Sequence, residues 1–479
     1  MKKKGFLLIL LTGVTFMAQS QYSWDLRKCV EYALANNISV KQADIQARRD
    51  ALMLEQAKLY QYPSLSLSTN TGMNSGRSID PTTNQFTQQQ LMSAGLNIQT
   101  GVSVFNWFSV KNNIAASQYQ AEAGKATVDK IKNDIALNVA SGYLLVLVAQ
   151  EQINISRVAV QQTGQNLENT RKRVEAGSLP ELNLMEIEAQ LARDSSNLIA
   201  AEASLQQNIL NLKAILNLDA AEKFDVLMPP IDQIPVESLM DLQPEIVYSL
   251  ALINLPQQRV NDLAIKSAKK MLEVSRAQMY PTLSLYGGLG TNYANNKIPK
   301  IITSPTGVFQ NTGAKVTVGG SEYNVVAPTY NTVISTYQKK FGTQFSDNFR
   351  ENVGIALSVP LFNNGNARTG WKRNKLNVES MELQKEQGER SLKQDIYKAY
   401  NDATMAVQKY NASLKTVSST EKAYSFAEKR YDLGLLSTID FLTNQNNLTR
   451  AKLESVLAKV DFIFRLKLLE FYKGKGIKL

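Results

Sequence analysis

The sequence predicts an α+β membrane protein in which a helix–strand–strand–helix unit occurs twice. Tyr280–Leu285 (YPTLSL) repeats Tyr62–Leu67 (YPSLSL) at an offset of 218 positions, and 430–440 (RYDLGLLSTID) repeats 173–183 (RVEAGSLPELN) at an offset of 257. Within each copy the apolar period changes from helical to strict alternation and back. The helical run from 106 to 176 contains no proline. At ~1.5 Å per residue it would extend roughly 105 Å, so we expect a coiled-coil-like stalk.

The predicted organisation follows from these repeats. We expect a signal peptide at 1–20, a first repeat at 21–217, a proline-containing linker at 218–243, a second repeat at 244–472 and a C-terminal tail at 473–479. Insertions between the copies are expected only in surface loops.

Composition excludes several classes of protein. Charged residues make up 20% of the 479 residues and hydrophobic ones 44%, which excludes a disordered chain and a bundle of apolar membrane helices. The net charge of +11 falls to +8 without residues 1–20, and the remaining basic residues are scattered among acids along the helices rather than clustered. That pattern indicates a solvated surface and no nucleic-acid partner. Histidine is absent and Cys29 is the single cysteine, so we expect no internal disulfide, no His/Cys metal site and no cofactor.

The first twenty residues resemble a secretory signal. MKKK is followed by the apolar stretch GFLLILLTGVTFM and by Ala18-Gln19-Ser20, a small-residue cleavage site before Gln21. No lipobox precedes Cys29. The longest later apolar run, near Tyr143 to Ala149, is too short for a transmembrane helix. Membrane insertion is therefore expected through β-strands.

In the first repeat, a helix is predicted over Trp24–Tyr60, because apolar residues recur there at helical spacing. Alternating strands are expected near 63–73 and 93–105, separated by a polar loop from about 72 to 90. The return helix of the stalk carries a leucine seam with a seven-residue spacing, at Leu191, Leu198, Leu205 and Leu212.

In the second repeat, strands are expected near 281–290 and 350–362, with a polar loop from about 291 to 350 between them. This loop holds the 39 residues by which the two offsets differ. No proline follows Pro360, so a second uninterrupted stalk is predicted to reach Leu433 and to resume to about Tyr472.

The two repeated stretches at 173–183 and 430–440 are predicted to be the tips of helical hairpins. Gly177 and Gly434 take equivalent positions, where a left-handed residue would end a helix. Ser437 and Asp440 form an [ST]-x-x-[DE] helix start, and Pro180 lies near the first turn of the other returning helix.

Four strands with one apolar and one polar face suit lipid on one side and water on the other. Four strands cannot close a barrel, and open edges in hydrocarbon leave backbone groups unpaired. Other copies of the chain are therefore expected to complete the sheet. Two copies would give eight strands and three would give twelve; alternation alone does not choose between them.

The signal peptide, the duplicated order of elements, the PSLSLS and SVPLFNNG strand ends and the RYDLGLLSTID tip resemble the TolC-like outer-membrane efflux channels. The resemblance covers nearly all of the chain after residue 20. It implies a homotrimer with a twelve-stranded transmembrane barrel in outer-membrane lipid and an α-helical tunnel in the periplasm. It also implies a passive exit channel for small molecules, opened by a periplasmic adaptor and an inner-membrane transporter of the RND or ABC type.

The resemblance also implies a periplasmic gate. Asp440, six residues after Gly434, matches the family's main acidic position; the alternative is that Asp440 only caps its helix. The chain departs from the family's pattern at three positions: Thr443 takes the second acidic position, Asn183 is the first-repeat counterpart of Asp440, and Leu436 takes the position of the basic residue that latches the closed state. The tyrosine that partners this basic residue is kept, as Tyr431. Either Glu181 or Glu186 could complete an acidic ring.

The tips also match the family's adaptor contacts, at Gly177, Ser178, Leu179, Gly434, Leu435, Leu436 and Ser437. The alternative is that these leucines pack within their own hairpins. Trp107 and Phe108 are expected either at a membrane–water boundary or in ordinary packing.

Two other functions remain open at this point. One is the exit duct of a type I protein secretion system, and the other is a soluble periplasmic coiled-coil adaptor, which would leave the alternating strands unexplained. No nucleophile elbow or phosphate loop marks an enzyme.

Overall fold

The computed structural model describes residues 23–79, 84–227, 234–295 and 297–474. The predicted signal peptide, Pro229 and Pro230 of the linker, and residues 475–479 lie outside the described residues. The chain divides into a helical unit (Met1–Leu54, Ala115–Lys269 and Lys375–Leu479) and a strand unit (Glu55–Ile114 and Lys270–Asn374).

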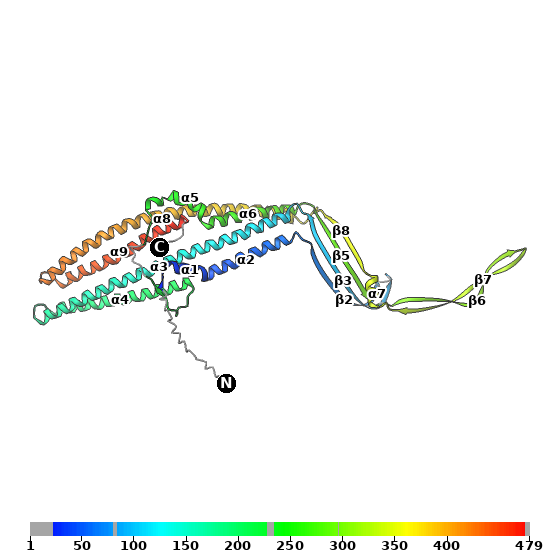
Figure 1. Cartoon of the computed structure of the whole chain (residues 1–479), viewed down its shortest axis with the longest axis horizontal. Helices are drawn as coiled ribbons and strands as arrows, with labels where there is room; N and C mark the ends of the chain where they lie inside the picture. Colours follow the sequence, from blue (N-terminus) through cyan, green and yellow to red (C-terminus); the bar gives the residue numbers. More distant parts are fainter. Residues whose placement is uncertain (1–22, 80–83, 228–233, 296, 475–479) are drawn as a thin grey trace, which may run out of the picture. The chain divides into compact units, whose positions relative to one another are not determined.

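Two long helical hairpins dominate the helical unit (Figure 1). The first consists of α3 (Ser109–Glu175) and α4 (Glu181–Leu216), the second of α8 (Asn366–Asp432) and α9 (Thr438–Tyr472). α3 and α8 each contain 67 residues, which corresponds to roughly 100 Å of helix. These are the uninterrupted stalk helices that the absence of proline predicts.

The predicted single helix over 24–60 is wrong, because the chain breaks at Asn37. The shorter helices are α1 (Leu26–Asn36), α2 (Ile38–Leu59), α5 (Pro244–Asn254) and α6 (Pro256–Ala277). Asn37 is extended, its Oδ1 accepts from the amide of Ser39 (2.8 Å), and its Nδ2 donates to the carbonyl of Ile215 (2.9 Å). Asparagine side chains compete with the helix for backbone groups in this way. The equivalent residue of the second half, Leu255, is also extended and is followed by Pro256.

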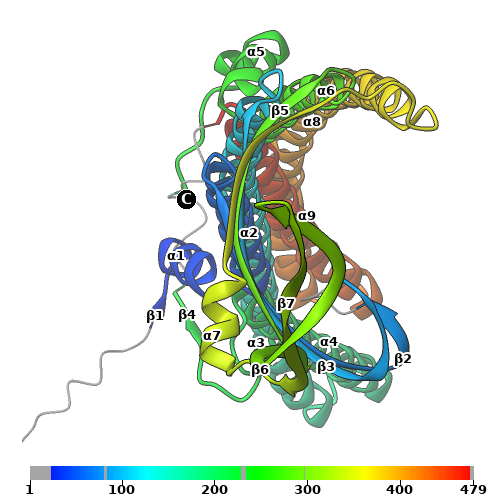
Figure 2. The same ribbon diagram turned by 90° about the vertical axis from the view of Figure 1, so that its right-hand side faces the viewer.

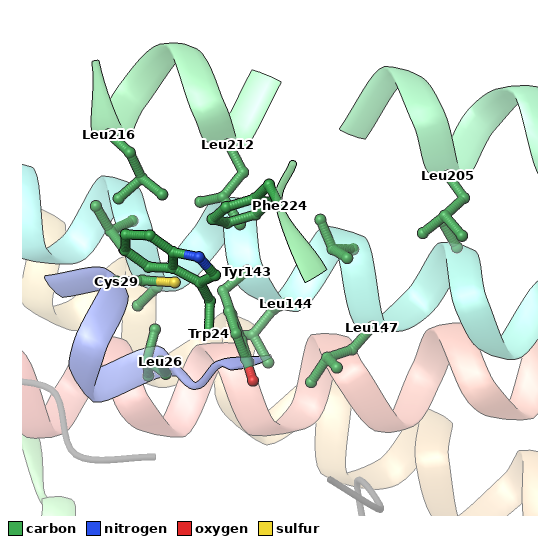
Figure 3. Close-up of a cluster of buried hydrophobic side chains, with 14 of the residues drawn as sticks. Trp24, Leu26, Cys29, Tyr143, Leu144, Leu147, Leu205, Leu212, Leu216 and Phe224 are labelled. Atoms are coloured by element: carbon green, nitrogen blue, oxygen red, sulfur yellow. The ribbon is translucent and has the colours of Figure 1, made fainter. Parts of the chain in front are cut away.

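A hydrophobic cluster fixes the first hairpin to the N-terminal segment (Figure 3). β1 (Ser23–Trp24) pairs in parallel with β4 (Asp225–Val226), and the Trp24 ring lies 5.2 Å from that of Phe224. On the α3 side the cluster contains Tyr143, Leu144 and Leu147, and on the α4 side Leu205, Leu212 and Leu216. By length and composition, α3 alone among the described helices could span a membrane. Its apolar segment instead supplies this core.

A second cluster holds the segment before α5 against the second hairpin. Leu242 of the short helix η2 (Leu239–Leu242) and Val247 of α5 are fully buried with Ile396 of α8 and Leu469 of α9. Alongside it, the buried Lys467–Glu470 ion pair (2.9 Å) and the amide of Glu237, which donates to Glu470 (3.0 Å), fix the chain to α9. Such a pair tolerates burial because its remaining polar atoms are hydrogen-bonded.

The strand unit contains a four-stranded antiparallel sheet in the order β2-β3-β5-β8. Its strands are β2 (Ser64–Ile79), β3 (Phe86–Phe105), β5 (Thr282–Ala294) and β8 (Arg350–Ser358). The register places Ser68 opposite Asn97 and Leu285 opposite Ile355. Within the described chain β2 and β8 are each paired on one side only, so both outer edges of the sheet are open. Figure 2 shows the sheet bent into an arc.

The two faces of the sheet differ in polarity, as alternation predicts. One face exposes apolar side chains; Leu65, Leu67, Val353, Ile355 and Leu357 are each at least 67% exposed. The other face carries serine, asparagine and glycine, starting with Ser64, Ser66 and Ser68. A fold in isolation does not leave such an apolar face in water, so the face requires lipid or another chain.

The polar stretch from 291 to 350, predicted as a loop, is in fact largely ordered. It contains the antiparallel hairpin of β6 (Ile298–Val318) and β7 (Ser321–Tyr337), and the helix α7 (Phe341–Asp347). Gly319 and Gly320 have φ of 61° and 88°, the two left-handed residues that a two-residue hairpin turn requires. Gln344 of α7 is 1% exposed and holds the end of β5 through both backbone groups of Ala294.

The strand-to-helix junctions are alike in the two halves. Trp107 and Phe108 have φ of 52° and 61°, and their counterparts Asn364 and Gly365 have 56° and 76°. The Trp107 Nε1 donates to the carbonyl of Pro281 (2.8 Å). This hydrogen bond compensates for placing a bulky residue in the left-handed region.

Candidate functional site at the hairpin tips

Each hairpin turns through the same pair of backbone hydrogen bonds. In the first, the amides of Gly177 and Ser178 donate to the carbonyls of Val174 (2.9 Å) and Arg173 (2.8 Å). In the second, the amides of Gly434 and Leu435 donate to the carbonyls of Tyr431 (2.9 Å) and Arg430 (2.8 Å). With φ of 69° and 74°, the two glycines complete Schellman motifs.

The returning helices begin differently. Ser437 caps α9: its Oγ accepts from the amide of Asp440 (3.2 Å) and donates to the Asp440 Oδ2 (2.7 Å). Pro180 precedes α4 and makes no side-chain cap. Asp440 therefore does cap its helix, yet its carboxylate is exposed and has no ion pair among the residues that the structure describes. Negative charge in this first turn is favoured by the helix dipole.

Tyr431 connects the two hairpins. Its hydroxyl lies 3.2 Å from the Thr170 Oγ1, and both residues are buried. The Arg173 Nη1 donates to the Tyr431 carbonyl (3.3 Å), and its guanidinium carbon lies 5.7 Å from the centre of the tyrosine ring. Arg173 thus supplies from the first hairpin a basic group that Leu436 cannot supply from the second. Neither Arg173 nor Thr170 was anticipated from the sequence.

An aromatic cluster lies behind Tyr431. The Phe441 ring stacks on Tyr431 (centroids 4.5 Å apart, planes 12° apart) and contacts Tyr424 (5.9 Å). Ile187 of α4 is fully buried in the same cluster, with Leu436 partly buried at its edge. Burial raises the pKa of Tyr424 to about 12, and the nearby Glu428 carboxylate acts in the same direction.

Further along the hairpins, buried polar side chains join α3, α4 and α9. The Thr163 Oγ1 donates to the Asp194 Oδ2 (2.7 Å), and the Gln445 Nε2 donates to Thr163 (2.7 Å). Gln190 donates to the Asp194 Oδ1 (2.8 Å) and to the Asn446 Oδ1 (3.0 Å). The sequence signal was available: Gln190 and Asp194 interrupt the seam between Ile187 and Leu198 at positions that face the partner helices.

The other predicted site residues have the following positions. Leu435 is 65% exposed, whereas Leu179 and Leu436 are half-buried. Asn183 is half-buried in the first turn of α4, and Thr443 is exposed, with its hydroxyl donating to the carbonyl of Ile439 (2.7 Å). Glu181 is exposed and Glu186 half-buried. The structure therefore brings Tyr431 into an inter-hairpin contact and leaves Asp440 and Thr443 on an exposed helix face.

Most of the chain matches a known protein family. The family model described as outer membrane efflux protein matches residues 30–218 and 247–463. The chain belongs to the outer membrane efflux protein family. Members of this family are channels rather than enzymes, and the chain is an outer-membrane efflux protein.

Relatives of this efflux protein include secretion and efflux components. The alkaline protease secretion protein AprF of Pseudomonas aeruginosa is 22% identical over 343 residues, 71% of this chain and 61% of AprF. The outer membrane protein TolC is 24% identical in Vibrio cholerae (81% of this chain, 77% of TolC) and 21% identical in Escherichia coli (95% and 82%). The chain therefore spans less than two thirds of the length of AprF.

Solved structures share the fold. CusC superposes with a TM-score of 0.74 at 16% identity, over 94% of this chain and 92% of CusC. VceC of Vibrio cholerae gives 0.73 at 16% identity, over 95% and 97%. The efflux protein therefore has the TolC-like channel fold.

Proposed function

We propose that three copies of this chain close their sheets into one twelve-stranded barrel in the outer membrane. The open edges of β2 and β8 carry the proposal, because unpaired backbone groups are not tolerated in hydrocarbon. Each copy adds four strands, and twelve leave a lumen wide enough for water, whereas eight are filled by their own side chains. The exposed apolar face would then contact lipid and the serine- and asparagine-rich face would line the water path.

In this assembly the two hairpins of each chain form a wall segment of a helical tunnel. The channel acts as the passive exit duct of a tripartite efflux system for small molecules. A periplasmic adaptor and an inner-membrane transporter, of the RND or ABC type, supply substrate and open it. The relatives named TolC support this assignment, and substrate choice belongs to the transporter.

The hairpin tips are proposed as the gate and the adaptor contact. Three Asp440 carboxylates would converge at the constriction, where mutual repulsion is offset by the cations they attract. Thr443, Asn183 and Tyr431 complete the gate region. The exposed Leu435, with the turn residues Gly177, Ser178, Leu179, Gly434, Leu436 and Ser437, offers the surface for the adaptor.

Protein secretion is the second candidate. It is supported by the alignment with AprF, a protein named for the secretion of alkaline protease. Purification of the tagged chain from its native membrane after cross-linking distinguishes the two: an RND-type partner supports small-molecule efflux, and an ABC exporter encoded with a protein substrate supports secretion.

Disulfide cross-linking tests the closed ring. In a Cys29→Ala background, Ser66→Cys on β2 is combined in turn with Gly354→Cys, Ala356→Cys or Ser358→Cys on β8. Within one chain β3 and β5 separate these strands by roughly 14 Å, too far for a disulfide. Oxidation should therefore give covalent dimers and trimers for at least one pair. Monomers alone for all pairs, in protein that stays water-soluble without detergent, would reject the proposed channel.

A further inference from the structure

The polar face of the sheet carries a single charged side chain within the described strands. We define this face by the even-numbered residues of β2, β5 and β8 and the odd-numbered residues of β3 up to Ser103, after which the register shifts. Its described side chains are serine, threonine, asparagine, glutamine, glycine, alanine, leucine and tyrosine, apart from Arg350 at the start of β8. All four strands join helices at the opposite end of the sheet, so Arg350 lies at the end remote from those junctions.

The absence of a side chain at Gly290 allows the Arg350 side chain to lie along the sheet. Gly290 lies opposite Arg350 in the register. A Cβ at Gly290 would lie 3.5 Å from the Arg350 Nε and 3.0 Å from the Asn97 Oδ1, so both side chains extend over this glycine from either side. Any larger residue at 290 would push them apart.

The charge of Arg350 has no partner in the part of the chain that the structure describes. No ion pair or hydrogen bond of its side chain occurs among the described residues, and Asp347, three residues earlier, is paired with Lys339 (2.9 Å). Glu351 projects from the opposite face. An open pocket of about 470 Å³ adjoins the guanidinium and is lined by the amides of Asn70, Asn74, Asn97 and Asn292. A guanidinium with five donors, beside several asparagine amides and with no carboxylate in the described lining of the pocket, is suited to bind an anion.

We propose that Arg350 forms a cationic ring in the barrel lumen that binds and selects anionic solutes, carrying carboxylate or phosphate groups, on their way out. The inference rests on the proposed trimer, which turns the polar face inward and repeats Arg350 three times. A neighbouring copy would place β2 beside β8, and the described polar-face residues of β2 carry no charge that could neutralise the ring. Rings of arginine or lysine select anions in pores of this kind.

The ring acts over a limited range. Exposed charges are screened beyond ~10 Å at 0.1 M salt and beyond ~3 Å at 1 M. The selectivity that Arg350 confers should therefore be present in dilute salt and absent in concentrated salt. The acidic gate proposed at Asp440 would favour cations, so the two sites are expected to act with opposite sign.

Reversal potentials of single channels in planar bilayers test the inference. We expect Arg350→Gln to lower the chloride-to-potassium permeability ratio roughly five-fold at 0.1 M, because it removes three unit charges from the lumen wall, with no difference at 1 M. Block by inorganic pyrophosphate should weaken roughly ten-fold, because the charge-assisted hydrogen bonds from the guanidinium to phosphate oxygens are lost. Arg350→Lys should retain most of the ratio. Arg77→Gln, the same change at a residue of β2 that lies on the opposite face of the sheet, should leave the permeability ratio unaltered.

A second variant tests the proposal even if Arg350→Gln fails to fold. Asn97→Asp would place a carboxylate beside the guanidinium without removing Arg350, and should lower the ratio by a similar factor. Wild-type channels that conduct while both variants keep the wild-type ratio, or shift no more than Arg77→Gln, would overturn the cationic ring and leave the channel assignment intact. Wild-type protein that forms neither a trimer nor a pore would overturn both.

Discussion

The contact of Tyr431 with Thr170 and Arg173 leads to a specific prediction about the gate. Tyr431→Phe keeps the stacking on Phe441 and removes the hydroxyl, which leaves the buried Thr170 hydroxyl without its partner at 3.2 Å. A lost hydrogen bond of this kind destabilises by about 1.5 kcal/mol, toward the upper end of the usual range because both residues are buried. Opening of the tip away from the first hairpin should then be roughly ten-fold more frequent.

Hydrogen exchange measured by mass spectrometry on the detergent-purified protein reports this opening directly. Peptides covering 425–436 should exchange about ten-fold faster in Tyr431→Phe, because local opening sets their rate. Arg173→Met should accelerate exchange by a similar factor, because it removes two interactions. One is the hydrogen bond to the Tyr431 carbonyl, and the other is the contact of the guanidinium with the tyrosine ring, which contributes about 0.5–1 kcal/mol. Closed-channel conductance should rise in both variants.

Tyr410→Phe is the matched control on the same helix. The Tyr410 ring stacks on Phe462 (5.6 Å), and its hydroxyl has no hydrogen bond among the described residues. Exchange in this control should stay at the wild-type rate. A Tyr431→Phe protein that exchanges within two-fold of wild type, or no faster than Tyr410→Phe, would refute the inter-hairpin contact as the element that holds the tips together.

Three further predictions follow from the structure. Asp440→Asn should lower cation selectivity and divalent-ion block in planar bilayers, because it removes the exposed carboxylate while keeping an oxygen for Ser437. Burial raises the pKa of Tyr424 to about 12, whereas an unfolded tyrosine loses its proton near pH 10. The free energy of unfolding should therefore fall as pH rises from about 10 toward 12. Tyr424→Phe should reduce that fall, as measured by thermal melts followed by circular dichroism. A ten-residue insertion at Thr312, in the exposed β6–β7 hairpin, should be tolerated, whereas the same insertion at Leu285, within the four-stranded sheet, should abolish assembly.

Each of these has a result that contradicts it. An unchanged reversal potential and unchanged block in Asp440→Asn would reduce that residue to a helix cap. An equal fall of the melting temperature in wild type and Tyr424→Phe between pH 10 and 12 would show that Tyr424 ionises equally in both states. Equal yields of detergent-stable oligomer after the two insertions would contradict the strand assignment.

Much of the local structure follows from residue order alone. A strand or helix with one solvent-exposed face has polar residues at regular intervals, with a period of two residues in a strand and 3.6 in a helix. This period predicts the strands of the sheet and the long helices. The hairpin turns follow for a similar reason: Gly177 and Gly434 take positive φ, which side-chain-bearing residues adopt at a cost. Even the break at Asn37 had a signal, in Pro256 one position after its counterpart Leu255.

Other features depended on partners that are distant in sequence. The sequence of the β6–β7 hairpin predicts a loop, because its threonine, asparagine and serine content obscures the alternation and neither face of the hairpin is buried in the chain. Pairing across the two strands, not burial, defines it.

The sequence by itself therefore determined the family, the order of helices and strands, and the sheet's two unlike faces, since each of these is a local consequence of hydrophobic pattern and turn chemistry. The tertiary structure alone decided which side chains meet. Arg173 and Tyr431 are 258 positions apart, and Arg350 reaches over Gly290 toward Asn97 only because three strands lie in one register. Periodicity specifies which face a residue occupies, but the neighbour across that face is set by helix packing and strand register, which no single segment encodes.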